Sequence, residues 1–176
     1  PAPLGALRLA RMPSAQRHRR GAHYTREEDI LRVVLPTIVR PFRERIAAAT
    51  SRAERRALHD ELASFKVLDP ACGSGNFLYI AHRELRRLEL LLLEEIGGPA
   101  RVSARQLYGI DIDPRAVELA RATLGLGDNI QQGDALFCGW PKVDAIIGNP
   151  PFQSKNKMQD ELGAAYVKRL RAAYRD

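Results

Sequence analysis

This sequence of 176 residues has little cysteine and no long apolar run. Its two cysteines, Cys72 and Cys138, cannot build a disulfide framework, and no cluster of cysteine and histidine has the spacing of a zinc site. The longest apolar run, Leu90–Leu93, is far shorter than the roughly 20 residues of a membrane span, and the basic N-terminus lacks the apolar segment of a signal peptide. We therefore expect a cytoplasmic protein with reduced cysteines, no metal and no membrane association.

Acidic residues are absent from residues 1–20, which contain five arginines and carry a charge of +5. Residues 153–176 carry +3, so the middle of the chain contributes −1 to the net charge of +7. Basic flanks around a near-neutral centre favour contact with a polyanion, but solvated tails have the same composition. The charge alone leaves both interpretations open. Residues 1–20 also lack periodicity, which predicts a disordered basic arm.

Helical signals dominate residues 21–65. Capping-box spacing, in which Ser or Thr is followed three positions later by Glu, occurs at Thr25 and at Ser51. Helices are therefore predicted to begin directly after each of these two residues. Pro36 and Pro41 interrupt the first apolar pattern and are expected to kink or end that helix.

From residue 66 onward, short apolar segments alternate with helical patterns. Strands are predicted over residues 66–69, 106–113, 129–137 and 143–148, and helices over residues 76–95, from Pro114 to a stop at Gly125, and from about 161 to 174. This alternation predicts an α/β fold in which a parallel sheet has helices on both faces, within a domain over residues 66–176. Residues 153–159, which include Lys155 and Lys157, are expected to form a mobile loop.

A glycine-rich turn follows the first predicted strand and reads Asp-Pro-Ala-Cys-Gly-Ser-Gly-Asn-Phe from Asp69 to Phe77. Glycines such as Gly73 let the backbone approach a ligand closely. A nicotinamide dinucleotide is disfavoured, because Leu78 replaces the third glycine of its fingerprint and Asp69 would repel a pyrophosphate. The next acid suited to a ribose, Asp111, lies 36 residues beyond the second glycine, whereas the dinucleotide motif places it about 20 residues on.

Two further aspartates lie at the ends of the second and third predicted strands. Asp111 is placed to accept hydrogen bonds from both hydroxyls of a ribose, and Ile112 to cover the face of an adenine. Asp134 is placed to accept a hydrogen bond from the amino group of that adenine. Asp113 precedes Pro114 and is better explained as a helix N-cap. Because parallel strands bring their carboxyl ends to one edge, these acids are expected to line a ligand site together with Asp69.

The sequence Asn149-Pro150-Pro151-Phe152 follows the fourth predicted strand. Prolines stiffen the backbone and remove amide donors, so carbonyl oxygens are left to act as acceptors. The amide oxygen of Asn149 and the carbonyl of Pro150 could accept both protons of one planar amino group, which would aim its lone pair at an electrophile. Phe152 offers a face on which a flat ring can stack. The tetrad therefore indicates a reaction at a nitrogen that is conjugated to a flat group.

With these motifs, the sequence resembles the gamma-class adenine DNA methyltransferases, and most of all the long single-chain enzymes of restriction–modification and phage-defence systems. The resemblance implies a Rossmann-like methyltransferase fold, S-adenosylmethionine as cofactor, and the exocyclic amino group of adenine in DNA as acceptor. Residues 21–25 are similar to the family's N-terminal cofactor motif. The resemblance implies cofactor binding by Tyr24, Thr25, Asp69, Ala71, Gly73, Asn76, Phe77, Asp111, Ile112, Asp134 and Ala135, and catalysis by Asn149, Pro150, Pro151 and Phe152.

The family's sheet has seven strands and is followed by a target-recognition domain, whereas four strands are predicted here. We therefore expect a fragment that is inactive alone. Its fourth strand is expected to lie beside the first as an open edge, which invites a companion chain or a second copy.

Two other interpretations stay open. Protein-glutamine and RNA-base methyltransferases use a similar tetrad, although the cofactor motif at residues 21–25, the aromatic Phe152 and the lysines of residues 153–159 favour DNA. A non-catalytic remnant that binds the cofactor or a partner protein is the third possibility, against which the intact motifs argue.

Overall fold

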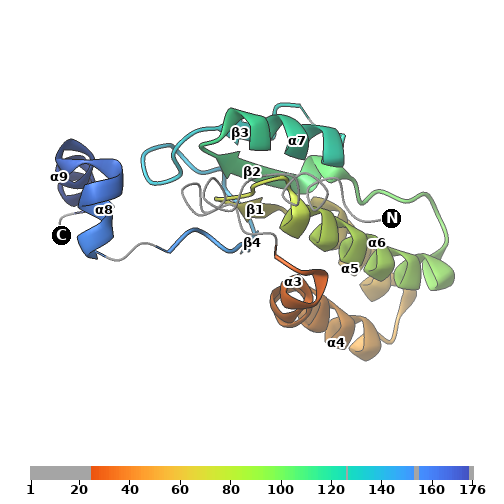
Figure 1. Cartoon of the computed structure of the whole chain (residues 1–176). Coiled ribbons are helices and arrows are strands. Elements are labelled where there is room, and N and C mark those ends of the chain that lie inside the picture. Colours follow the sequence, from red (N-terminus) through yellow and green to blue (C-terminus); the bar gives the residue numbers. More distant parts are fainter. Residues whose placement is uncertain (1–24, 126, 153–154, 175–176) are drawn as a thin grey trace.

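The computed structural model describes residues 25–125, 127–152 and 155–174. The basic arm predicted over residues 1–20 and the cofactor residue Tyr24 lie outside this part of the chain. The elements follow one another as in Figure 1. They are α3 (Glu27–Val34), η1 (Leu35–Val39), α4 (Arg40–Ala48), α5 (Arg52–Ser64), β1 (Val67–Asp69), α6 (Asn76–Ile96), η2 (Ala104–Gln106), β2 (Leu107–Asp111), α7 (Pro114–Leu124), β3 (Ile130–Gln132), β4 (Ala145–Ile146), α8 (Lys155–Leu162) and α9 (Ala164–Ala173).

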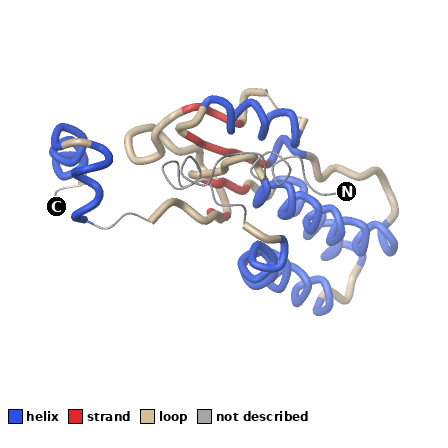
Figure 2. The backbone as a smooth tube through the Cα atoms, in the orientation of Figure 1, coloured by secondary structure: helices blue, strands red, loops and turns tan. Residues whose placement is uncertain are grey.

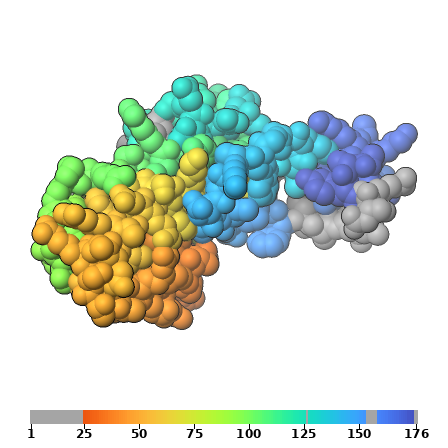
Figure 3. All heavy atoms as spheres, turned by 180° about the vertical axis from the view of Figure 1, so that it is seen from behind, coloured from red at the N-terminus to blue at the C-terminus, as the bar shows by residue number. Residues whose placement is uncertain are grey.

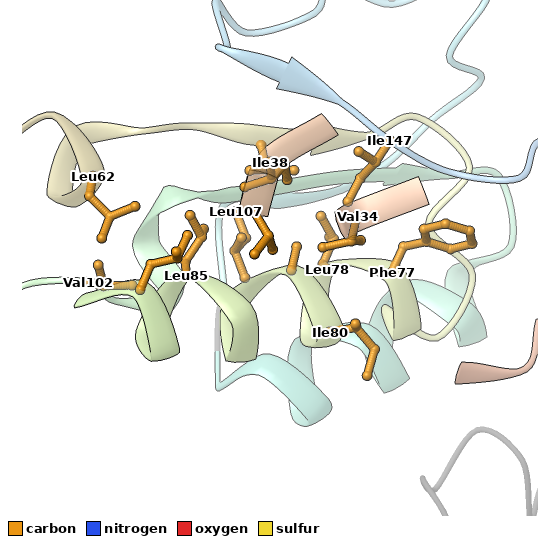
Figure 4. Packing of buried hydrophobic residues seen from close by; sticks show 14 of the residues in the cluster. Val34, Ile38, Leu62, Phe77, Leu78, Ile80, Leu85, Val102, Leu107 and Ile147 are labelled. Atoms are coloured by element: carbon orange, nitrogen blue, oxygen red, sulfur yellow. The ribbon is translucent and has the colours of Figure 1, made fainter. Parts of the chain in front are cut away.

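The four strands form one parallel sheet in the order β3-β2-β1-β4, with helices packed beside it (Figure 2). This confirms the predicted α/β fold and the place of the fourth strand at an edge beside the first. Crossovers between parallel strands are almost always right-handed, so the two successive steps β1–α6–β2 and β2–α7–β3 place both helices on the same side of the sheet. Figure 4 shows α6 and α7 together below the strands.

The strands supply one layer of the hydrophobic core and α6 supplies the next. Val67, Leu107 and Ile130 face the helices from three neighbouring strands, and each is completely buried. Leu78 and Leu85 of α6 are equally buried beneath them (Figure 4). Burying an aliphatic side chain of this size stabilises a fold by about 1.5–3 kcal/mol, so this interface fixes the sheet against α6.

The N-terminal helices differ from the prediction at one helix start. The capping box at Thr25 is wrong, because α3 has Arg26 as its N-cap and no side chain caps it. Three acidic residues in the first turn, beginning with Glu27, complement the positive end of the helix instead. The prolines were expected to kink or end the first helix, and the structure has the π-helical turn η1 at Leu35–Val39, which continues directly into α4. The capping box at Ser51 is confirmed.

The C-terminal part corrects another prediction. Lys155–Leu162 is helix α8, so the expected loop over residues 153–159 is wrong for the residues that the structure describes there. Gly163, at φ +83°, separates α8 from α9. The two helices stand beside the main body in the space-filling view (Figure 3). Across the described ranges, none of the helices has the length and apolar character needed to cross a membrane.

Candidate active site

The carboxyl ends of the four strands meet at one edge of the sheet. The strand order places the loop with Asp134 at one end, then Asp111 and Asp69, and the loop with Asn149 after β4 at the other end. The structure therefore brings the predicted acids and the predicted tetrad to one edge, where open α/β sheets bind ligands.

Asp69 is the most buried polar group at this edge, with 1% of the residue exposed. Its Oδ1 accepts a hydrogen bond of 3.0 Å from the Ala71 amide. Burial, opposed by the Ala71 amide and assisted by the negative charge of Asp111, raises the pKa of Asp69 to about 7. This carboxylate is therefore poised for a cationic partner, which would favour its ionised form.

Gly148 packs directly against Asp69 at the end of β4. A Cβ atom built on Gly148 would lie 2.5 Å from Asp69 Oδ1, and the glycine has φ +154°. Side chains are excluded here by space and by backbone conformation alike. The close approach joins the glycine-rich turn after β1 to the tetrad that begins at the next residue, Asn149.

The glycine-rich turn is held by its backbone. The Cys72 amide donates to the Ile110 carbonyl at 2.9 Å, and the Gly75 amide donates to the Cys72 carbonyl at 2.8 Å. Gly75 begins α6 at φ +84°, and a Cβ there would lie 3.3 Å from Cβ of Ala120 in α7. The turn thus approaches α7 closely and leaves the start of α6 facing the ligand edge.

The other predicted cofactor residues near the turn have different surroundings. Ala71, Gly73 and Asn76 are half-buried, while Phe77 is buried and packs in the hydrophobic core. Thr25 is half-buried just before α3.

Asp111 links the ends of two strands. Its Oδ2 accepts a hydrogen bond of 2.8 Å from the Gly73 amide, and its Oδ1 accepts one of 2.9 Å from the Asp113 amide. A carboxylate has about four acceptor positions, so two backbone donors leave capacity for two ligand hydroxyls. Ile112 beside it is exposed at 68%, which leaves an apolar face free. Asp113 caps α7 by accepting from the Arg115 amide, as predicted.

Asp134 is held from two sides. Its Oδ1 accepts from the Leu136 amide at 3.0 Å, and its Oδ2 accepts from the Tyr166 hydroxyl at 2.8 Å. Next to it, the Ala135 carbonyl accepts from the Trp140 indole at 2.8 Å. Neither Tyr166 nor Trp140 was identified by sequence reasoning. Asp134 lies in the loop after β3, whereas Tyr166 lies 32 residues further on in α9, so no local sequence pattern predicts their contact.

The tetrad is the exposed side of the site. Asn149, Pro150 and Pro151 are exposed, and Phe152 is exposed at 90%. Ile147, just upstream, is buried at 3% and its amide donates to the Leu68 carbonyl of β1 at 2.9 Å. The chain is therefore anchored to the sheet immediately before the tetrad, and the four residues extend from that anchor into solvent.

A family model described as the MmeI DNA-methyltransferase domain matches residues 46–137. That is more than half of the chain, and it includes three of the four strands. The chain belongs to this family. Its resemblance to adenine-specific DNA methyltransferases of restriction–modification systems is confirmed by this match and by the relatives that follow.

Several known proteins are similar to this member of the MmeI methyltransferase family. DNA methyltransferase A of Bacillus subtilis (strain 168) is 31% identical over an alignment that covers 80% of this chain and 21% of the relative. The adenine-specific methyltransferase PglX of Streptomyces coelicolor is 30% identical over 56% of this chain and 9% of its own length. The chain therefore spans about a fifth or less of these two relatives.

A solved structure, that of the Type IIL restriction-modification enzyme MmeI in complex with DNA, has the same fold. The likeness has a TM-score of 0.76 and 25% sequence identity, and it covers 92% of this chain and 28% of that one. The match extends over nearly the whole chain, so the parallel sheet and its helices are those of the MmeI methyltransferase domain.

Proposed function

We propose that this chain binds S-adenosylmethionine and, as part of a longer enzyme, transfers its methyl group to the exocyclic amino group of adenine in DNA. The observation that carries the proposal is the contact between Asp69 and Gly148, because it sets the Asn-Pro-Pro-Phe tetrad beside the row of aspartates. A cofactor edge and an amino-group acceptor are thereby placed next to one another on one sheet edge.

The residues at the edge fit each part of the cofactor. The buried Asp69 suits the cationic methionine end, because an ammonium group would offset the burial that raises its pKa. Asp111 has spare acceptor positions for the two ribose hydroxyls, and Ile112 exposes an apolar face for the adenine ring. Asp134 is the acceptor for the adenine amino group. When bound, the cofactor supplies an activated methyl group on a sulfonium.

The tetrad supplies the acceptor side of the reaction. A target adenine is flipped out of the duplex and stacks on Phe152. Its amino group donates one hydrogen bond to the Asn149 amide oxygen and one to the Pro150 carbonyl. These two acceptors direct the nitrogen lone pair at the methyl carbon. A nitrogen–carbon bond forms as the carbon–sulfur bond breaks, and the methylated nitrogen releases a proton to solvent. Positioning and electrostatics supply the rate enhancement, so no strong base is required.

The test is methyl transfer to adenine in plasmid DNA by an enzyme as long as the relatives that carries this domain. Asn149→Ala should lower the rate about 10²–10³-fold, as removal of one oriented polar group does in other active sites, with cofactor affinity unchanged. The matched control is Asn129→Ala, because Asn129 bonds the Arg105 carbonyl at the opposite end of the sheet. An Asn149→Ala enzyme as fast as its parent would contradict the proposal.

A further inference from the structure

Helix α9 docks on the connection between β3 and β4, close to the proposed adenine end of the cofactor. Tyr166 lies edge-to-face against Phe137 with ring centroids 5.3 Å apart, and the Arg169 guanidinium lies 3.8 Å from the centroid of the same ring. The Tyr174 hydroxyl donates to the Leu136 carbonyl at 2.8 Å. These contacts hold the helix in place while the Tyr166 hydroxyl donates to Asp134.

We propose that Tyr166 is a positioning residue for the adenine end of the cofactor, because it holds the Asp134 carboxylate where it accepts the adenine amino group. The inference rests on the proposed function, in which Asp134 contacts that group. It adds a residue from α9, beyond the catalytic tetrad, to the cofactor site.

The geometry around Asp134 indicates that Tyr166 orients the carboxylate and does not compete with the ligand amino group for it. The Leu136 amide holds Oδ1 and the Tyr166 hydroxyl holds Oδ2, so both oxygens have a fixed direction. A carboxylate with about four acceptor positions still has room for a ligand amine. Burial and the bond to Asp134 raise the pKa of Tyr166 to about 12, so the phenol keeps its proton and remains a donor at neutral pH.

The same contact links two ends of the site. Helix α9 follows the tetrad in the chain and exposes Lys168 and Arg171, which are suited to phosphate. If the cofactor's adenine is held better when α9 is docked, α9 is also docked better when the cofactor is bound, since binding linkage is reciprocal. Cofactor binding would thereby stabilise the docked position of this basic helix.

The experiment is a calorimetric titration of S-adenosylhomocysteine into the chain and two variants. Tyr166→Phe keeps the ring and its contact with Phe137, and it should weaken binding about 2–10-fold, the effect of one hydrogen bond. Tyr79→Phe is the matched control, because it removes the hydroxyl of an exposed tyrosine in α6 and leaves the contacts of α9 in place. We expect the control to bind as the parent does.

A second ligand separates positioning from a general structural role. This analogue of S-adenosylhomocysteine has hydrogen in place of the adenine amino group, and Tyr166→Phe should leave its affinity unchanged. Equal losses for both ligands, no loss for either, or tighter binding by Tyr166→Phe would each overturn the inference while leaving the cofactor site intact. A parent chain that binds neither ligand would overturn the proposed function and the inference together.

Discussion

The proposed cofactor side and the proposed target side of the sheet edge are built differently. On the cofactor side Asp69 is exposed at only 1%, and the Asp111 carboxylate already accepts two backbone amides. On the target side Phe152 is exposed at 90%, just beyond the anchor at Ile147. In this proposal the cofactor meets a site that is formed before it binds, whereas the target base must itself cover the exposed ring of Phe152.

This difference agrees with the role proposed for each side, which is cofactor binding on one and stacking of the target base on the other. A row of buried or bonded carboxylates is held in one geometry by its own backbone, which lowers the entropy cost of binding. An aromatic ring in water gains stability only when a flat partner stacks on it, so Phe152 contributes to the bound state rather than to folding. Substitutions on each side test whether one side can be changed without affecting ligand binding at the other.

The largest effect is expected where the two sides touch. Gly148→Ala would place a Cβ 2.5 Å from Asp69 Oδ1, on a backbone with φ +154°. Overpacking of this kind costs about 1–3 kcal/mol, and here it also displaces a proposed cofactor ligand. Thermal unfolding should shift to lower temperature, and titration should show that the affinity for S-adenosylhomocysteine is lost.

Gly139→Ala is the control for that substitution, because a Cβ there has no heavy-atom neighbour within 4 Å and the backbone is not left-handed. It should leave both measurements unchanged. A Gly148→Ala chain that binds and melts like the parent would show that the two sides are not joined at this point.

A smaller effect is expected on the cofactor side alone. Asp111→Ala removes the proposed ribose acceptor and leaves the Gly73 and Asp113 amides without their hydrogen bonds to this carboxylate. The free energy of cofactor binding should therefore weaken by about 1–3 kcal/mol. Asp113→Ala removes the N-cap of α7 and should cost stability of about 1 kcal/mol with little loss of affinity. Calorimetry on both variants, with melting curves, distinguishes the two roles. Equal affinity losses would remove the special role of Asp111.

Sequence reasoning predicted several helix boundaries well, because these features depend on local rules. Asp113 as an N-cap, Gly125 as a helix end and the Ser51 capping box depend on neighbours a few positions away. The place of β4 beside β1 also agrees with the prediction, which came from the strand order of the family that the sequence resembles.

The errors arose where tertiary contacts override local patterns. Lys155–Leu162 is polar except for Met158 and Leu162, which is too little apolar pattern to predict a helix, yet it forms α8 beside α9. Thr25 has capping-box spacing, but the chain enters α3 one residue later than that box requires. The bond between Tyr166 and Asp134 spans 32 residues, so only the folded chain reveals it.

A pH dependence of about tenfold is expected from Asp69. Burial raises its pKa to about 7, so ionised Asp69, which a cationic methionine end requires, becomes prevalent only as the pH rises through that value. Affinity for S-adenosylhomocysteine should therefore increase about tenfold between about pH 6 and about pH 8. Asp69→Asn should remove the increase. An unchanged pH profile in this variant would assign the titration to another group.

The stability of the free chain should follow the opposite course. A carboxyl whose pKa is raised on folding stabilises the fold fully below its unfolded pKa, near 3.8, and this contribution is lost as the pH rises through about 7. The free energy of unfolding should thus fall between these two values in the parent chain and fall less in Asp69→Asn. Denaturant titrations at several pH values measure this difference.

The most direct test of the central comparison is calorimetric titration of S-adenosylhomocysteine into the parent chain and into Phe152→Ala. Because Phe152 is exposed at 90% and lies on the target side, the variant should bind with the parent's affinity and melt at the parent's temperature. Its hold on a flipped adenine should weaken by about 1–3 kcal/mol. A loss of cofactor affinity in Phe152→Ala as large as that in Asp111→Ala would contradict the account, because the two sides would then form a single site.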